Sequence, residues 1–259
     1  MFAKYHGLGN DFVIVEGTAL MSAAEAVALC HRNRGIGGDG VLSILPSRTP
    51  EAAFRMHLYN ADGSVAEMCG NGLRCVVRHK LGAASAGERV VVDTDGGPRW
   101  GLTRAGGAVK VGLGRPEILQ DRLTVEVDGR TFSGVSISMG NPHFVLTPIE
   151  PGLELAVLAR TWGARIENHP AFPARTNVEL FRPAADGGID VVVWERGAGL
   201  TQACGTGAGA TRAAAEHWGL VRSGPVSVRL PGGALSVTRE EDGEIAIEGE
   251  AVHVFSGNA

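Results

Sequence analysis

Apolar and polar positions along the chain follow one order of predicted elements, and that order occurs twice. In each half a strand-like apolar run ends at a polar residue, and a Cys-Gly-x-Gly sequence begins nine positions later. The first run ends at Asn60 before Cys69, and the second ends at Glu195 before Cys204. The equal spacing indicates that the two halves repeat one structural plan.

A helical pattern follows each cysteine. Between Cys69 and Gly82 the leucines and valines fall on one face of a predicted helix, and Gly82 is a stop signal. Residues 208–218 are rich in strong helix formers, and Gly219 follows them. Each cysteine is therefore predicted to lie at or just before a helix N-terminus.

Two further helices are predicted outside these motifs. Residues 22–34 read as a helix in which Ser22 and Glu25 form a capping box and Gly35 ends the helix. Its counterpart in the second half is predicted over residues 153–162, with Gly163 as the stop.

Other landmarks repeat at offsets of 131 to 137 residues. They are Gly9-Asn10 with Gly140-Asn141, the turn–strand–proline runs at 37–46 and 174–183, and the hairpin turns at 95–97 and 231–233. We therefore predict an α/β (α+β) fold of two homologous, pseudo-symmetric domains. Each is expected to be a curved, barrel-like, mostly antiparallel sheet around a central helix, with the active site in the cleft between them. The expected bounds are 1–116 and 117–250, with the last strand, about 251–259, able to pack with the first domain.

Composition narrows the class of protein. The 259 residues carry a net charge of −4 and show no basic face, which argues against nucleic acid or an anionic membrane as the main partner. The chain has no apolar run of transmembrane length and no signal-peptide pattern. Four cysteines are too few for a disulfide scaffold, so a reducing cytoplasm is expected.

A cysteine at a helix N-terminus has two readings. The free N–H groups and the positive end of the helix dipole favour a thiolate there, whereas a small buried residue among glycines is the structural alternative. Two such thiols facing one carbon would suit an inversion at Cα, with the helix amides near Gly70, Asn71, Gly205 and Thr206 binding the α-carboxylate. No lysine stands in a recognisable pyridoxal-phosphate context, so no cofactor is expected.

The motifs together resemble those of the diaminopimelate epimerase family, from residue 2 to the C-terminus. They are Gly9-Asn10-Asp11-Phe12, Asn60-Ala61-Asp62-Gly63, Cys69-Gly70-Asn71-Gly72-Leu73-Arg74-Cys75, Gly140-Asn141-Pro142-His143, Arg175-Thr176-Asn177, Glu195-Arg196-Gly197 and Ala203-Cys204-Gly205-Thr206-Gly207-Ala208.

The resemblance implies a cofactor-independent enzyme that interconverts LL- and meso-2,6-diaminopimelate for lysine and peptidoglycan synthesis. It implies Cys69 and Cys204 as the acid/base pair, and His143 and Glu195 as residues that tune the thiols. The substrate-binding residues implied are Asn10, Asn60, Gly70, Asn71, Asn141, Asn177, Glu195, Arg196, Gly205 and Thr206.

Two positions depart from the family pattern. Gly40 stands where some relatives carry a glutamine that contacts the substrate, so that side-chain contact is lost or comes from another group. Phe255 stands where some relatives have a tyrosine at the dimer contact. A homodimer is still expected, without that hydrogen bond.

Three alternatives remain open from the sequence. A zinc site formed by Cys69, Cys204, His143 and Glu195 lacks the closely spaced Cys-x-x-Cys pair of strong zinc motifs. A proline racemase-like enzyme shares the two-cysteine plan, but such enzymes tend to have histidine where Asn71 stands, and proline would leave Arg196 little to bind. A non-catalytic amino-acid binding module would leave two activated thiols without a role.

Overall fold

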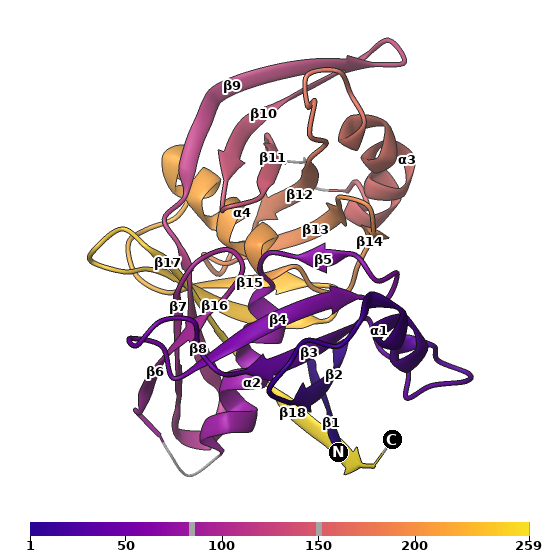
Figure 1. The fold of residues 1–259 in the computed structure, drawn as a ribbon. Coiled ribbons are helices and arrows are strands. Elements are labelled where there is room, and N and C mark those ends of the chain that lie inside the picture. The colour runs from indigo at the N-terminus through magenta and orange to yellow at the C-terminus, as the bar shows by residue number, and fades with distance from the viewer. Residues whose placement is uncertain (83–85, 149–151, 259) are drawn as a thin grey trace. The chain divides into compact units, whose positions relative to one another are not determined.

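The computed structural model of the chain describes residues 1–82, 86–148 and 152–258. These residues form two compact units, Met1–Gly112 with Glu248–Ala259, and Leu113–Ile247. Each unit combines a mostly antiparallel arrangement of strands with two α-helices (Figure 1). The predicted α/β class is therefore confirmed.

The first unit begins and ends with strands that pair with each other. β1 and β18 are antiparallel, with Phe2 opposite Gly257, so the two chain ends meet in this unit (Figure 1). The elements are β1 (Phe2–Gly7), β2 (Asn10–Glu16), α1 (Ala23–Cys30), β3 (Gly40–Leu45), β4 (Phe54–Asn60), β5 (Val65–Ala66), α2 (Gly70–Leu81), β6 (Arg89–Asp93), β7 (Arg99–Thr103), the 3₁₀ turn η1 (Ala105–Gly107), β8 (Val109–Gly114) and β18 (Val252–Gly257).

The second unit opens with a long hairpin formed by β9 and β10 (Figure 1). The elements are β9 (Glu117–Val127), β10 (Arg130–Ser138), β11 (Pro142–Leu146), α3 (Leu155–Glu167), β12 (Asn177–Pro183), β13 (Ile189–Glu195), β14 (Gly199–Leu200), α4 (Gly205–His217), β15 (Val226–Leu230), β16 (Gly233–Arg239) and β17 (Ile245–Gly249).

Strand pairing follows the same order and sense in both units. In the first unit β18, β1 and β2 pair antiparallel, β2 is parallel to β3, β3 and β4 are antiparallel, and β4 is parallel to β6. In the second unit β9, β10 and β11 pair antiparallel, β11 is parallel to β12, β12 and β13 are antiparallel, and β13 is parallel to β15. The sequence repeat therefore corresponds to a repeat of topology.

The helix after each cysteine is the buried one in its unit. α2 packs against β1, β2 and β7, and α4 packs against β10 to β13, β15 and β16. Every residue of α4 from Gly205 to Ala215 is buried, because glycines and alanines let the strands approach closely. A Cβ on Gly209 would lie 3.1 Å from the Ile245 Cγ2 atom, which is already tight.

The helix predicted over residues 22–34 forms with its capping box but ends early. The Ser22 side chain accepts the Glu25 N–H and Glu25 reaches back to the Ser22 backbone, yet α1 stops at Cys30. The reason lies in the following loop, whose amides at residues 36 and 37 donate to the Leu29 carbonyl at 3.0 and 2.9 Å. Because these bonds satisfy the last carbonyls, the chain turns back at His31 rather than at the predicted Gly35.

The prediction for the helix at residues 153–162 is wrong about where the helix ends. α3 runs through Gly163 to Glu167, so this glycine lies inside the helix. A Cβ at Gly163 would lie 2.4 Å from the Trp194 Cγ atom. The glycine is therefore explained by the indole that packs on it and not by a helix end.

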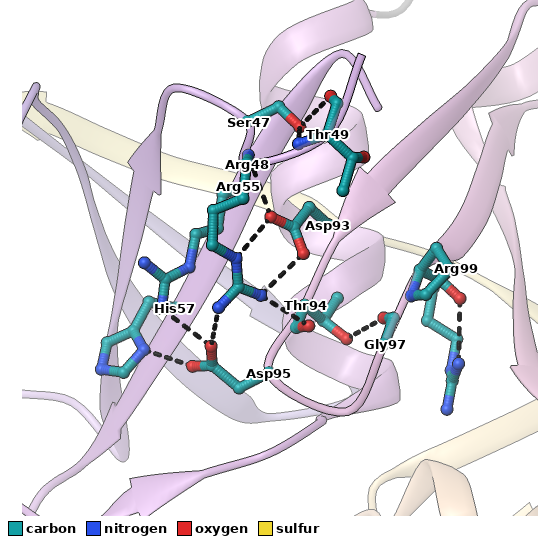
Figure 2. Close-up of polar contacts among 11 residues, drawn as sticks. Ser47, Arg48, Thr49, Arg55, His57, Asp93, Thr94, Asp95, Gly97 and Arg99 are labelled. Atoms are coloured by element: carbon teal, nitrogen blue, oxygen red, sulfur yellow. Dashed lines mark hydrogen bonds and ion pairs between the residues drawn. The ribbon is translucent and has the colours of Figure 1, made fainter. Parts of the chain in front are cut away.

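An ion-pair cluster fixes the parallel pair of β4 and β6 (Figure 2). Arg48 donates to both oxygens of Asp93, with Nε–Oδ2 at 2.8 Å and Nη2–Oδ1 at 2.7 Å. Asp95 accepts from Arg48 and from Arg55 at 3.2 and 2.8 Å, and contacts the Nδ1 atom of His57. The hydrogen bond from Arg48 lowers the pKa of Asp93 against its partial burial. The cluster contains none of the predicted site residues.

Candidate active site

Both cysteines are the N-cap residues of the buried helices, as predicted. Cys69 precedes α2 and its Sγ atom accepts the N–H of Gly72 at 3.4 Å. Cys204 precedes α4 and its Sγ atom accepts the N–H of Gly207, also at 3.4 Å. Each unit thus presents one sulfur to the amides and the positive dipole end of a helix.

In the first unit, Asn10 links the cysteine to the start of α2. The Oδ1 atom of Asn10 accepts a hydrogen bond from the Asn71 Nδ2 atom at 3.1 Å. It also accepts one from the Cys69 thiol, with Sγ at 3.9 Å. Its Nδ2 atom donates to the Asp39 Oδ2 atom at 2.8 Å. Asp39 therefore fixes the amide of Asn10 with its carbonyl end toward the cysteine.

A charged network holds Asp39 in place. Arg32 donates to Asp39 at 2.8 Å and also to Asp11 at 2.8 and 3.1 Å, and the buried Lys4 ammonium donates to Asp11 at 2.5 Å. Burial raises the pKa of Asp11, but the hydrogen bonds from Arg32 and Lys4 outweigh burial and lower it to about 2.

Acid should weaken this network. Because the folded pKa of Asp11 is lowered from 3.8 to about 2, its stabilisation is present above pH 4 and is lost as the pH falls through about 2. We expect Asp11→Asn to reduce the free energy of unfolding by about 1–2 kcal/mol at pH 7 and by little at pH 2. Urea unfolding at both pH values measures this, with Asp121→Asn on the exposed part of β9 as the control. An equal loss at both values would contradict it.

Asn60 lies at the end of β4, directly opposite Gly40 on β3. Its Nδ2 atom donates to the Ser64 hydroxyl at 3.0 Å, which closes the turn after the strand. A Cβ on Gly40 would lie 2.6 Å from the carbonyl oxygen of Tyr59. A glutamine at position 40 would therefore need a backbone shift, and this chain offers no side chain there.

Cys204 is only 5% exposed, and its surroundings differ from the sequence expectation. Burial raises the pKa of the thiol well above its usual value, and the charges of Glu195 and Glu179 raise it further. The Thr206 hydroxyl, 3.5 Å from the Sγ atom, and the Gly207 N–H act in the opposite direction. At this cysteine, burial outweighs the helix dipole on which the prediction of a thiolate was based.

His143 lies at the centre of a hydrogen-bonded chain in the second unit. Its Nδ1 atom lies 2.6 Å from the Glu179 Oε1 atom, and its Nε2 atom lies 3.0 Å from the Asn141 Oδ1 atom. The Nδ2 atom of Asn141 donates to the Thr206 hydroxyl at 3.3 Å. A chain of hydrogen bonds thus runs from His143 through Asn141 and Thr206 to Cys204.

The remaining predicted residues lie on β12, β13 and the turn after β13. The Asn177 Oδ1 atom accepts the backbone N–H of Arg196 at 2.9 Å, and its Nδ2 atom donates to the Pro142 carbonyl at 2.8 Å. The Arg196 side chain is exposed, and Glu195 accepts from the Thr201 hydroxyl at 2.5 Å. Asn177 therefore ties the turn that carries Arg196 to the start of β11.

The predicted set is divided between the two units, and hydrogen bonds link Asn10 and Asn71 to Cys69 in the first unit, and His143, Asn141 and Thr206 to Cys204 in the second. The first unit carries Asn10, Asn60, Cys69, Gly70 and Asn71, and the second carries Asn141, His143, Asn177, Glu195, Arg196, Cys204, Gly205 and Thr206. Among residues 1–82, 86–148 and 152–258, no group of three or more His, Cys, Asp or Glu side chains is arranged to hold a metal ion. None of the helices in these ranges has the length and apolar composition needed to cross a membrane.

Among the residues of these networks that sequence reasoning missed are two carboxylates, Asp39 behind Asn10 and Glu179 behind His143. Glu179 had a usable signal, because it stands between Val178 and Leu180 in the buried part of the strand, two positions after Asn177, and so shares the face of Asn177. Asp39 follows two glycines in a loop, where no periodicity marks a side-chain direction.

Comparison with known proteins gives matches along almost the whole chain. The sequence model of the family described as "Diaminopimelate epimerase" matches residues 2–119 and 135–254. A diaminopimelate epimerase from Synechococcus sp. is 41% identical over 278 residues, which cover 99% of this chain and 96% of the relative. A relative of the same name from Thermosynechococcus vestitus is 40% identical over 285 residues, covering 99% and 98%.

Solved structures share the fold at low sequence identity. A probable proline racemase from Agrobacterium radiobacter gives a TM-score of 0.77 at 18% identity, covering 100% of this chain and 92% of that one. A hydroxyproline epimerase from Agrobacterium vitis gives a TM-score of 0.73 at 17% identity, covering 98% and 88%. These two likenesses show the fold alone. The family match and the relatives aligned over nearly their full length show that the chain belongs to the diaminopimelate epimerase family, whose members are isomerases.

Proposed function

We propose that the chain interconverts LL- and meso-2,6-diaminopimelate without a cofactor, as a step toward lysine and peptidoglycan. The observation that carries the proposal is the repeated geometry of Cys69 and Cys204, each an N-cap sulfur 3.4 Å from a helix amide. Membership of the diaminopimelate epimerase family supplies the substrate class.

In the proposed reaction the two sulfurs act on opposite faces of one Cα. One thiolate removes the Cα proton, and the electron pair of the broken C–H bond moves onto the α-carboxylate. The other cysteine, a thiol, then gives its proton to the opposite face, and the electron pair returns to form the new C–H bond. The thiol and thiolate have exchanged roles after one turnover, so the same pair serves both directions.

The helix N-termini would hold the charge that develops on the carboxylate. Gly70 and Asn71 lie in the first turn of α2, and Gly205 and Thr206 lie in the first turn of α4, where backbone N–H groups and the positive end of the helix dipole favour a bound anion. Such preorganised donors stabilise a developing oxyanion more than they stabilise the ground state.

The far end of the substrate carries a second carboxylate and ammonium, which need a polar pocket. We propose that the exposed Arg196 guanidinium pairs with the distal carboxylate. The asparagines Asn10, Asn60, Asn141 and Asn177 supply amide donors and acceptors for the remaining groups of the substrate.

We also propose a cellular compartment and an oligomeric state for the enzyme. The enzyme would work in the cytoplasm, where a reducing environment keeps both thiols available.

A homodimer would cover β18, where Val254 and Phe255 remain 52% and 46% exposed. Sedimentation of the native chain and of a Phe255→Lys variant tests this, and a monomeric native chain would contradict it.

Exchange of the Cα proton with solvent tests the function directly. Incubation with LL-diaminopimelate in heavy water should produce the meso isomer with one deuterium per inversion, at a rate unchanged by a chelator. L-Proline run in parallel separates the proline racemase alternative, because deuterium in proline and none in diaminopimelate would assign the chain to that chemistry. Stoichiometric zinc in the active protein would overturn the two-thiol mechanism.

A further inference from the structure

Glu179 is a carboxyl group buried without the partners that such a group normally needs. It lies on β12 with 0% exposure, and its Oε2 atom has no hydrogen-bond partner among the described residues. Its Oε1 atom lies 2.6 Å from the Nδ1 atom of His143, which is also 0% exposed. Because an isolated buried charge is very unfavourable, the two groups are best treated as one buried pair.

The pair retains one proton between its two members. A net negative charge on the pair, away from water, would cost more free energy than taking up a proton. Consistent with this, burial raises the pKa of Glu179, although the charge and the hydrogen bond of His143 act in the opposite direction. The shared proton lies either on the Glu179 oxygen or on the His143 Nδ1 atom. In a pair without net charge, the first arrangement has a neutral ring that accepts at Nδ1 and the second has a ring protonated on both nitrogens, so in both the Nε2 atom that faces the Asn141 oxygen carries a proton.

That Nε2 proton decides how the Asn141 amide points. The Nε2–H group donates to the Asn141 Oδ1 atom at 3.0 Å, so the carbonyl end of the amide is occupied by His143. The Nδ2 end therefore faces the Thr206 hydroxyl at 3.3 Å and donates to it. Since the Thr206 oxygen accepts that bond, its own hydrogen is left for the Cys204 Sγ atom at 3.5 Å.

The equivalent asparagine of the first unit points the other way. Asp39 takes the Nδ2 group of Asn10, so the Oδ1 atom of Asn10 faces Cys69 as an acceptor. The carbonyl end of Asn10 therefore contacts Cys69 directly, whereas the Nδ2 end of Asn141 points toward Cys204 through the Thr206 hydroxyl. The difference follows from the partner behind each amide, which is a carboxylate behind Asn10 and a protonated ring nitrogen behind Asn141.

We propose that Glu179 is a positioning residue that holds His143 in its Nε2-protonated form and so directs a hydrogen-bond donor, through Asn141 and Thr206, onto the Cys204 sulfur. The proposal rests on the proposed function in one respect, that Cys204 acts as an acid and base. Gly207 provides the room for this arrangement, because a Cβ there would lie 3.1 Å from Glu179 Oε1 and 3.3 Å from Cys204 Cβ.

The protonation state of His143 is measured without substrate. Nitrogen-15 NMR of histidine-labelled protein, with the His143 signals assigned from a His143→Asn variant, should show a protonated Nε2 atom at neutral pH. In Glu179→Gln the neutral amide can pair with either tautomer, so the Nε2 signal should move toward its unprotonated position. An unprotonated Nε2 atom in the native protein overturns the proposal whatever reaction the enzyme catalyses.

Kinetic measurements provide the second test of the proposed role of Glu179. Glu179→Gln should lower kcat about five- to tenfold with KM changed by less than about twofold, since one hydrogen bond to the acid/base group is weakened. Glu216→Gln is the matched control, because Glu216 lies on α4, the helix that Cys204 caps, and pairs with Arg212 and Arg239 at 2.9 and 2.6 Å, outside the chain of contacts from Glu179 to Cys204. Equal kcat losses in the two variants would reduce Glu179 to a structural role.

A double-mutant cycle separates a linked chain from independent effects. In a Thr206→Val background the hydroxyl that reaches Cys204 is gone, so adding Glu179→Gln should change kcat little further. Fully additive losses overturn the proposal. Failure of the epimerase function itself appears differently, as absence of deuterium exchange by the native protein with the His143 protonation unchanged.

Discussion

Replacing Cys204 with alanine is expected to abolish epimerisation in both directions, and Cys69→Ala is expected to do the same. In the proposed mechanism each direction needs one sulfur as base and the other as acid, so neither variant would retain a complete pair. Loss of one acid/base group should reduce kcat by at least about 10³-fold. Separate assays starting from the LL and the meso isomer measure both directions.

The buried Cys75 supplies the control for this experiment. It lies inside α2 with 0% exposure, and burial raises the pKa of its thiol to about 12. Cys75→Ala should keep most of the native rate while losing some stability, because it removes a packed sulfur and no reacting group. Rates within tenfold of native in either N-cap variant would show that one thiol suffices.

Gly163→Ala is expected to destabilise the second unit, although helix propensity alone predicts the opposite. Alanine in place of glycine inside α3 should stabilise the helix by about 1 kcal/mol. The new Cβ, however, would lie 2.4 Å from Trp194 Cγ and 2.8 Å from Trp194 Cβ, so the indole or the helix must move. Overpacking of this kind costs about 1–3 kcal/mol. Because Trp194 is also tied to Glu167 at 2.8 Å, we expect a cost at the upper end, about 3 kcal/mol, and so a net loss of about 2 kcal/mol after the gain in helix propensity.

Thermal unfolding of Gly163→Ala and of Ala164→Gly measures the balance between helix propensity and overpacking. Ala164→Gly, at an exposed position of the same helix, should lose about 1 kcal/mol from propensity alone and calibrates that effect. Trp194 directly precedes Glu195, so Gly163→Ala should also raise KM for diaminopimelate, whereas Ala164→Gly should not. A higher melting temperature for Gly163→Ala would contradict the close packing of the indole.

Local patterns predicted the parts of the fold that depend on neighbours in sequence. The apolar runs that end at Asn60 and Glu195, the helix starts at Cys69 and Cys204 and the capping box at Ser22 all depend on groups a few positions apart. The offset near 135 residues between the halves was equally visible, because both halves carry the same turn and cap signals in the same order.

Contacts between distant segments decided the points on which local patterns were wrong. Gly163 reads as a helix stop, yet it lies inside α3 because Trp194, 31 positions later, packs on its bare backbone. Similarly, α1 ends at Cys30 because the following loop folds back and satisfies its last carbonyls. A glycine that ends a helix and a glycine on which a distant side chain packs look the same in the local sequence, and so do helix ends with different causes.

By itself, the sequence determined that this protein has two α/β units of one topology, each with a cysteine capping a buried helix, because strand periodicity and cap chemistry are short-range properties. Only the tertiary structure decided what surrounds each sulfur. Burial and the charges of Glu195 and Glu179 raise the pKa of Cys204, and the pairing of Glu179 with His143 joins residues 36 positions apart. Burial and charge at a point in space depend on every segment packed there, and no spacing along the chain encodes them.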